Sequence, residues 1–124
     1  MSIRVTEVPF IAYPVTDLER AKDFYERIIG LPCTMDHPLP EDGQRWIEFD
    51  AGNTTIAISN FMPPAQGSGV GAALEVEDLD AALETLRAEK IEFRSEPMES
   101  PGCRFFVIAD PDGNDLTIHQ HKQD

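Results

Sequence analysis

Two short stretches of the sequence carry side chains that could bind a metal ion or a ligand. In the first, His119 and His121 lie two residues apart in LTIHQHK, so on a strand both would point to the same side. A His-x-His pair can chelate a transition metal, and Glu48 or His37 could complete such a site. Because His121 lies close to the C-terminus, we instead expect His119 at the rim of a cavity with a mobile neighbour.

The second stretch, QRWIEFD, places Trp46 and Glu48 two residues apart. An indole ring can stack on a flat or cationic molecule, and a carboxylate beside it can pair with an amine or act as a base if buried. A core or rim tryptophan and a solvated carboxylate are the alternative interpretations. His37 lies in DHPLPEDG, which we expect to be a loop at the mouth of the cavity.

Composition narrows the class of protein. The 124 residues, of which 41% are hydrophobic, are typical of one globular domain. A net charge of −13 disfavours nucleic acids and anionic membranes as partners, and it fits either a cationic small molecule or simple solubility. No apolar run approaches the about 20 residues of a membrane span, and no signal peptide is recognisable. Cys33 and Cys103, without CxxC spacing, predict reduced, buried thiols in a cytoplasmic protein.

The elements that must position these side chains occur twice. PVTDLERAKDFY (14–25) resembles EVEDLDAALETL (75–86), and AGNTTIAIS (51–59) resembles DGNDLTIH (112–119). Such self-similarity indicates one supersecondary unit used twice. The order in each unit is a strand, a helix and three more strands.

Capping residues and periodicity predict the boundaries. Asp17 and Asp78 are suitable N-caps, each is followed by apolar residues at helical spacing, and Gly30 is a suitable C′ residue for the first helix. The first strands fall in 8–15 and 71–76. The later strands are expected at 33–37, 46–50, 54–59, 91–94, 104–109 and 116–119.

Together these elements predict a single α+β domain. It consists of two tandem βαβββ modules that form a cup-shaped mixed sheet with helices on its outer face. Module one covers about 5–60 and module two about 70–121. The segment 61–69, with two prolines and two glycines, is the expected linker.

Strand alternation predicts which side chains face the cavity of the cup. Apolar residues such as Ile56, Ile58, Leu116 and Ile118 should pack beneath the helices. The opposite face then mixes small, aromatic and polar residues, as small-molecule pockets do. From this face we select six ligand-binding residues: Phe10, Trp46, Glu48, Ser59, Thr117 and His119.

VTDLERAKDFYERIIGL in the first module, and VEDLDAAL with FFVIADPDGNDLTIHQ in the second, resemble the vicinal oxygen chelate superfamily. This superfamily includes glyoxalases, extradiol dioxygenases and bleomycin-resistance proteins. The DPDGN turn between two strands is common near the end of its second module. The resemblance covers nearly the whole chain and implies the fold described above.

The resemblance also implies where metal ligands would lie, on the first and last strand of each module. Those positions are Phe10, Ala57, Gly71 and Thr117. Phenyl, methyl and hydrogen donate nothing to a metal, and a neutral hydroxyl is a poor ligand for a divalent ion. We therefore expect no metal and no other cofactor at the ordinary site of this family.

By resemblance, the favoured function is that of a metal-free small-molecule-binding protein similar to bleomycin-resistance proteins, which sequester a basic drug. The implied partners are a cationic or aromatic ligand and a second copy of the chain, and the implied role is antibiotic resistance. The alternative is a metal-dependent glyoxalase-like lyase or dioxygenase with Glu48, His119 and His37 as relocated ligands. A third possibility is a structural or regulatory dimer with a closed cavity.

Overall fold

The computed structural model describes residues 4, 6–62 and 71–122. The first module contains β1 (Ile11–Pro14), α1 (Leu18–Asp23), the π-helical turn η1 (Phe24–Ile28), β2 (Cys33–Pro38), β3 (Arg45–Asp50) and β4 (Thr55–Ser59). The second contains β5 (Ala72–Glu75), α2 (Leu79–Ala88), β6 (Met98–Ser100), β7 (Cys103–Ala109) and β8 (Asp115–His121). The expected linker lies outside the described residues from 63 to 69.

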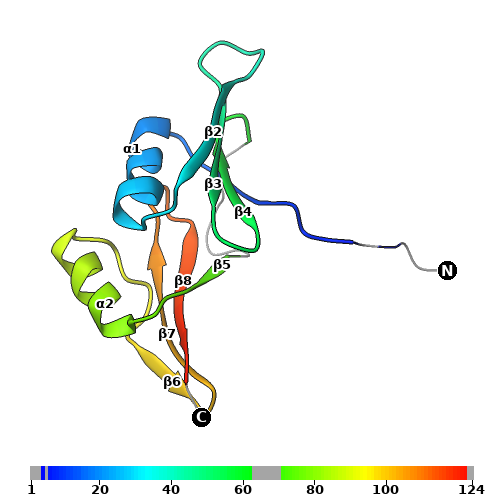
Figure 1. The fold of residues 1–124 in the computed structure, drawn as a ribbon. Coiled ribbons are helices and arrows are strands. Elements are labelled where there is room, and N and C mark those ends of the chain that lie inside the picture. The colour runs from blue at the N-terminus through cyan, green and yellow to red at the C-terminus, as the bar shows by residue number, and fades with distance from the viewer. Residues whose placement is uncertain (1–3, 5, 63–70, 123–124) are drawn as a thin grey trace.

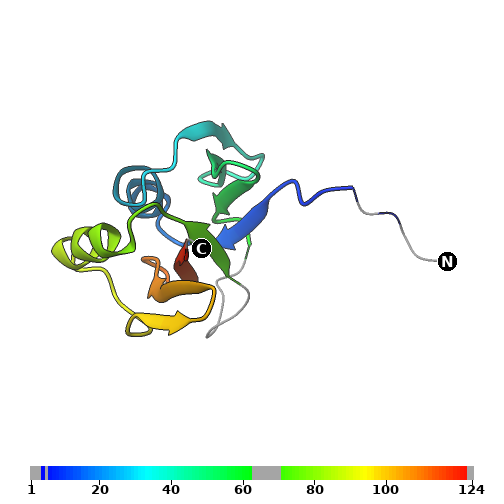
Figure 2. The ribbon, with the colours of Figure 1, turned by 60° about the horizontal axis from the view of Figure 1, so that its bottom comes forward.

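The strands form two four-stranded sheets with the same topology. Their orders are β1-β4-β3-β2 and β5-β8-β7-β6, and in each the first strand pairs with the last in parallel. Both helices lie on one side of the sheets, and the other side stays open (Figures 1 and 2). The α+β fold of two tandem modules is confirmed, and the mixed sheet of the cup is made of these two sheets.

The helices begin as the sequence predicts. The carboxylate of Asp17 accepts a hydrogen bond from the Arg20 amide, and that of Asp78 from the Ala81 amide, both at 3.1 Å. The first helix does not continue as a regular α-helix, because its last turn is wider and the Ile29 amide donates to the Phe24 carbonyl. Gly30, with φ of +88°, ends it.

The predicted strand at 91–94 is wrong. Phe93 makes an isolated bridge to Ile108, and the amides of Arg94 and Ser95 both donate to the Val107 carbonyl. Two donors on one acceptor cannot continue a regular ladder, so the chain bends there. The strand that pairs with β7 is β6, after Pro97.

The core lies between the sheets and the helices, as alternation predicts. The buried sheet residues are Ile47, Phe49, Ile56, Ile58, Phe106, Ile108, Leu116 and Ile118, and those of the helical segments include Ala21, Phe24, Tyr25, Leu79 and Leu86. The thiols of Cys33 and Cys103 are free, but they are half-buried rather than buried as expected. Within the described part of the chain, no helix has the length and apolar character that crossing a membrane requires.

A buried hydrogen bond joins the two modules. The Tyr25 hydroxyl donates to Asp110 at 2.8 Å, and the other oxygen of Asp110 accepts from the amides of Asp112 and Asn114. Burial, followed by the negative charge of Asp110, raises the pKa of Tyr25 well above its usual value. The DPDGN turn therefore serves to fasten the second module to the first helix of the chain.

Candidate functional site

Three aromatic rings gather on the open face of the first module. The Trp46 ring lies 5.2 Å from that of Phe10, edge to face, and 6.2 Å from that of Phe61. Trp46 reaches this face because it alternates along β3 with the fully buried Ile47. Phe10 and Phe61 flank it from the segments before β1 and after β4, with 44% and 51% of their surfaces exposed. We call Phe10, Trp46 and Phe61 the aromatic cluster.

A carboxylate completes the cluster. The Trp46 indole N–H donates to Glu48 Oε2 at 2.7 Å, so the ring and the acid are held together. A cavity of about 370 Å³ opens beside Trp46 and Phe61, lined also by Leu39, Pro40, Glu41 and Gln44. Aromatic faces beside carboxylates form an environment that attracts organic cations.

Two further selected residues lie in neighbouring strands: Ser59 is opposite Trp46 in the ladder of β3 and β4, and Thr117 lies in β8 of the second module. Ser59 is fully buried; its hydroxyl donates to the Arg45 carbonyl at 2.7 Å and accepts from the Phe61 amide. Its hydrogen-bonding capacity is therefore used by the backbone rather than offered to a ligand. Thr117 is half-buried and pairs with Ala73 and Val107 on neighbouring strands.

His119 and His121 meet Glu75 on the open face of the second module. His119 Nδ1 lies 2.6 Å from Glu75 Oε1, and His121 Nε2 lies 3.7 Å from the same oxygen. The His121 amide donates to Glu75 Oε2 at 2.7 Å. This backbone bond, followed by the bond from His119, lowers the pKa of Glu75 below its usual value.

The predicted partners of His119, Glu48 and His37, are not beside it. Glu48 contacts Trp46, and His37 lies in β2, where it pairs with Trp46 in the ladder. The expectation that His37 lies in a loop is therefore wrong, although it is exposed. In the described part of the chain, the one group of three potential metal ligands is Glu75, His119 and His121.

A cavity of about 460 Å³ adjoins this histidine group. Its lining comes from both modules: Ile11, Leu31, Ala51, Asn53, Thr54 and Ile56 from the first, and Ala72, Ala73, Leu74, Glu75, His119 and His121 from the second. None of the three aromatic rings lines it. Of the selected residues, Phe10, Trp46 and Glu48 thus gather at the aromatic cluster, whereas His119 lines this second cavity.

The positions where the resemblance implies metal ligands do not fit a metal. The Phe10 ring packs against Trp46, Ala57 is fully buried, and Thr117 offers only a hydroxyl. At Gly71 a Cβ atom would lie 2.6 Å from the backbone oxygen of Asp115, so no side chain is accommodated there without a shift of β8. These four residues cannot together coordinate an ion.

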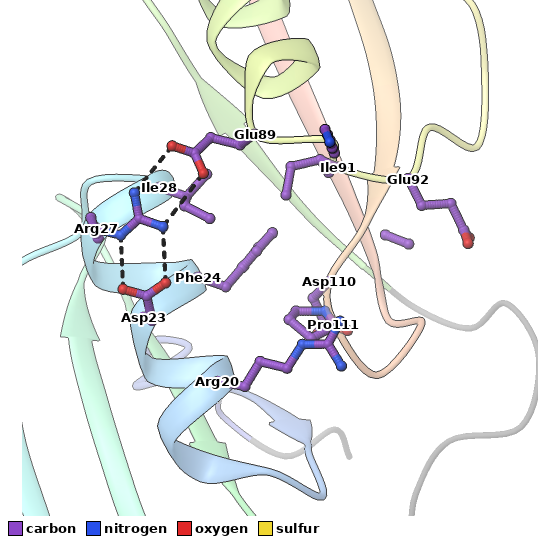
Figure 3. A pocket seen from close by; sticks show the side chains of 12 residues that line it. Arg20, Asp23, Phe24, Arg27, Ile28, Glu89, Ile91, Glu92, Asp110 and Pro111 are labelled. Atoms are coloured by element: carbon purple, nitrogen blue, oxygen red, sulfur yellow. Dashed lines mark hydrogen bonds and ion pairs between the residues drawn. The ribbon is translucent and has the colours of Figure 1, made fainter.

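A third hollow lies between the modules on the helix side (Figure 3). Arg27 lines it and forms ion pairs with Asp23 at 2.8 Å and with Glu89 at 3.1 Å. The second of these links η1 to the residue that ends α2. Because the Arg27 guanidinium already pairs with two carboxylates, we interpret this hollow as part of the junction between the modules and not as a ligand site.

Two residues that the structure brings into these places are not among the six selected from the sequence, although alternation puts Glu75 on the same face. Glu75 is the partner of His119, and pairing the first strand of the second module with its last would have placed the two opposite each other. Phe61 falls in the expected linker 61–69. No sequence signal distinguished it, because its position depends on how the chain leaves β4.

The comparisons with known proteins agree with the architecture. Residues 7–118 match the family model described as the Glyoxalase/Bleomycin resistance protein/Dioxygenase superfamily. The structure of TnmS3, an antibiotic binding protein from Streptomyces sp. CB03234, superposes with a TM-score of 0.80, at 26% identity, covering 98% of this chain and 100% of that one.

The relatives found by sequence include a bacterial protein and a mitochondrial epimerase. Uncharacterized protein YetH of Bacillus subtilis is 25% identical over 114 residues, covering 89% of this chain and 94% of YetH. The mitochondrial methylmalonyl-CoA epimerase of Homo sapiens is 30% identical over 100 residues, or 72% of this chain, but the match spans only 57% of the epimerase. The repeated modules, their topology and the family match lead to one conclusion: the chain belongs to the glyoxalase/bleomycin resistance protein/dioxygenase superfamily, the vicinal oxygen chelate superfamily.

Proposed function

We propose that this protein binds a small aromatic or cationic molecule without transforming it, at the aromatic cluster and Glu48. The observation that carries this proposal is the partly exposed Trp46 ring, flanked by Phe10 and Phe61 and bonded to a carboxylate. The ligand site itself needs no metal.

The physical chemistry favours a cation over a neutral guest. A cation over an indole face is stabilised by about 0.5–2 kcal/mol. Glu41 lines the cavity beside Trp46, and Glu48, which accepts a hydrogen bond from the indole N–H, adds a second carboxylate next to the ring. The net charge of −13 attracts cations over a longer range, and it disfavours nucleic acid and anionic membranes as partners. Salt should weaken the attraction because it screens the protein's field.

The relatives support a binding role. TnmS3 is described as an antibiotic binding protein, and its fold matches nearly the whole chain. By this similarity we infer that the ligand is an antibiotic or a related natural product, and that sequestration confers resistance. The free thiols of Cys33 and Cys103 support a reducing, cytoplasmic location.

We further infer that the chain forms a homodimer through its open side. Large apolar side chains are exposed there or nearby: Val8, Phe10, Met35 and Phe61. Residues 6–10 run away from the body of the molecule in both views, as an arm that contacts a second copy would (Figures 1 and 2). A single species of twice the chain mass in light scattering is the expected result, and a monomer at all concentrations would contradict it.

A metal-dependent lyase or dioxygenase is the second candidate. The group of Glu75, His119 and His121 favours it, and a likeness to methylmalonyl-CoA epimerase is consistent with enzymatic relatives. This candidate requires metal-dependent turnover of a substrate, whereas the binding proposal requires only saturable binding of an unchanged ligand.

The test uses two molecules with the same ring system and opposite charge. Calorimetric titration should give measurable binding of 9-aminoacridine, which is cationic at pH 7, and much weaker binding of acridine-9-carboxylate. Trp46→Ala should weaken binding of the cation by about 2- to 30-fold. Met98→Ala, which removes an exposed apolar side chain from β6, is the matched control and should have no effect.

Two results would contradict the proposal. Equal affinity for the two acridines would remove the role of charge, and equal affinity of the Trp46→Ala and Met98→Ala variants would place the binding elsewhere. Recovery of chemically altered acridine after incubation would favour an enzyme instead.

A further inference from the structure

We propose that Glu75, His119 and His121 bind one transition-metal ion of the zinc, nickel or copper class on the open face of the second module. This site is separate from the positions where the superfamily resemblance places a metal and from the aromatic cluster. It goes beyond the proposed ligand-binding function.

The donor atoms have the spacing that such an ion requires. With metal–ligand bonds of about 2.0–2.1 Å and tetrahedral angles, neighbouring donors lie about 3.3 Å apart. The distances from Glu75 Oε1 are 2.6 Å to His119 Nδ1 and 3.7 Å to His121 Nε2, which bracket that value. All three donors lie within 4.8 Å of one another, so small side-chain rotations suffice to surround an ion.

The backbone holds the three residues in this arrangement. Glu75 and His119 are direct partners in the parallel ladder of β5 and β8, and the Val76 amide donates to the His119 carbonyl at 2.8 Å. His121 follows on the same face of β8, with its ring 4.9 Å from that of His119. The His121 amide donates a hydrogen bond to Oε2 of Glu75 and so holds the carboxylate in place. Pre-arranged ligands lose less conformational entropy when an ion binds.

The site is accessible to an incoming ion and to a further ligand. The side chain of His119 is 23% exposed, that of Glu75 48% and that of His121 76%. Three protein ligands leave at least one coordination position for water or for a guest in the adjoining cavity of about 460 Å³.

The ligand types select the class of ion. Imidazole suits zinc, copper and nickel, whereas magnesium and calcium prefer sites built from oxygen atoms. Two imidazoles and one carboxylate therefore favour nickel or zinc over magnesium by a wide margin.

Calorimetric titration of untagged, chelator-stripped protein with NiCl₂ tests the site, with MgCl₂ as the comparison. We expect one nickel ion per chain in the micromolar range and no magnesium binding at the same concentrations. His119→Gln, His121→Gln and Glu75→Gln should each weaken nickel binding by at least the roughly 10- to 100-fold that is typical of losing an outer-shell partner. His37→Gln removes an exposed histidine outside the group and should leave the affinity unchanged.

Circular dichroism of each variant shows whether it is folded, and His121→Gln, at the most exposed of the three side chains, keeps the test valid if a substitution at His119 unfolds the protein. Nickel binding that is absent, no tighter than magnesium binding, or unchanged in a folded His121→Gln variant would overturn the proposal. So would a loss of binding in His37→Gln of the same size. Repeating the acridine titration in nickel-free buffer separates the two proposals, since either site can fail while the other is retained.

Discussion

The parallel ladders of the two modules present different side chains at the same register position. In the first module the fourth pair is Pro14 with Ser59, and in the second it is Glu75 with His119. Ser59 is buried with its hydroxyl bonded to the backbone, whereas Glu75 and His119 contact each other at a partly exposed surface. The same backbone topology therefore carries two different surfaces, and the side chains at equivalent positions decide what each surface can bind.

The position that precedes each ladder differs in the same way. In the first module it is Phe10, whose ring projects toward Trp46, and in the second it is Gly71, which has no room for a Cβ atom. The first module consequently carries an apolar aromatic surface and the second a polar one. This difference between the modules can be tested by disrupting the contact that joins them and by substituting residues in one module at a time.

The largest effect should follow from breaking the contact that holds the two modules together. Asp110→Ala leaves the buried Tyr25 hydroxyl and two backbone amides of the DPDGN turn without an acceptor. We expect a loss of about 3–4 kcal/mol in the free energy of unfolding, measured with urea. Asp80→Ala, which removes an exposed ion pair with Arg104 and an exposed charge in the first turn of α2, should cost much less. Equal losses would show that Asp110 does not join the modules.

A smaller loss should follow from placing a side chain where the second module excludes one. Gly71→Ala brings a Cβ atom against the Asp115 carbonyl, and relieving that clash should cost about 1–3 kcal/mol. Gly102→Ala is the matched control, because its Cβ atom would meet nothing within 4 Å. If urea unfolding gave the same stability for both variants, the close approach of Gly71 to β8 would be refuted.

The smallest effect concerns the pH dependence of the junction between the modules. Because the pKa of Tyr25 is raised in the folded protein, its contribution to stability is complete below about pH 10, the pKa of an exposed tyrosine, and is lost as the pH rises above that value. Tyr25→Phe should cost about 0.5–1.5 kcal/mol at pH 7 and flatten the decline of stability above pH 10.

Urea unfolding of both proteins between pH 7 and 11 measures this difference. Part of the loss of stability above pH 10 should remain in Tyr25→Phe, because the pKa of Tyr13 is also raised, mainly by burial. If the free energy of unfolding fell equally with pH in both proteins, Tyr25 would be excluded as a source of the loss of stability.

Much of the fold follows from local signals in the sequence. Asp17 and Asp78 mark the helix starts because a short carboxylate side chain satisfies amides that the helix leaves free. Alternation identified the buried face of the strands, since side chains one residue apart point to opposite sides. Where these signals are weak the prediction was wrong: residues 91–94 have strand-like composition, but their irregular bonding to Val107 ends the ladder.

Sequence reasoning alone predicts that the chain has two related modules, that Trp46, Glu48 and His119 lie on the side of the strands opposite the helices, and that His119 and His121 point the same way. Three contacts become visible only in the folded chain. Phe61 completes the aromatic cluster, Glu75 rather than Glu48 or His37 meets the histidines, and Asp110 accepts a hydrogen bond from Tyr25. The reason is physical. Capping and alternation depend on neighbours within a few residues, whereas these contacts join segments from 15 to 85 residues apart, whose proximity depends on how strands pair and modules pack.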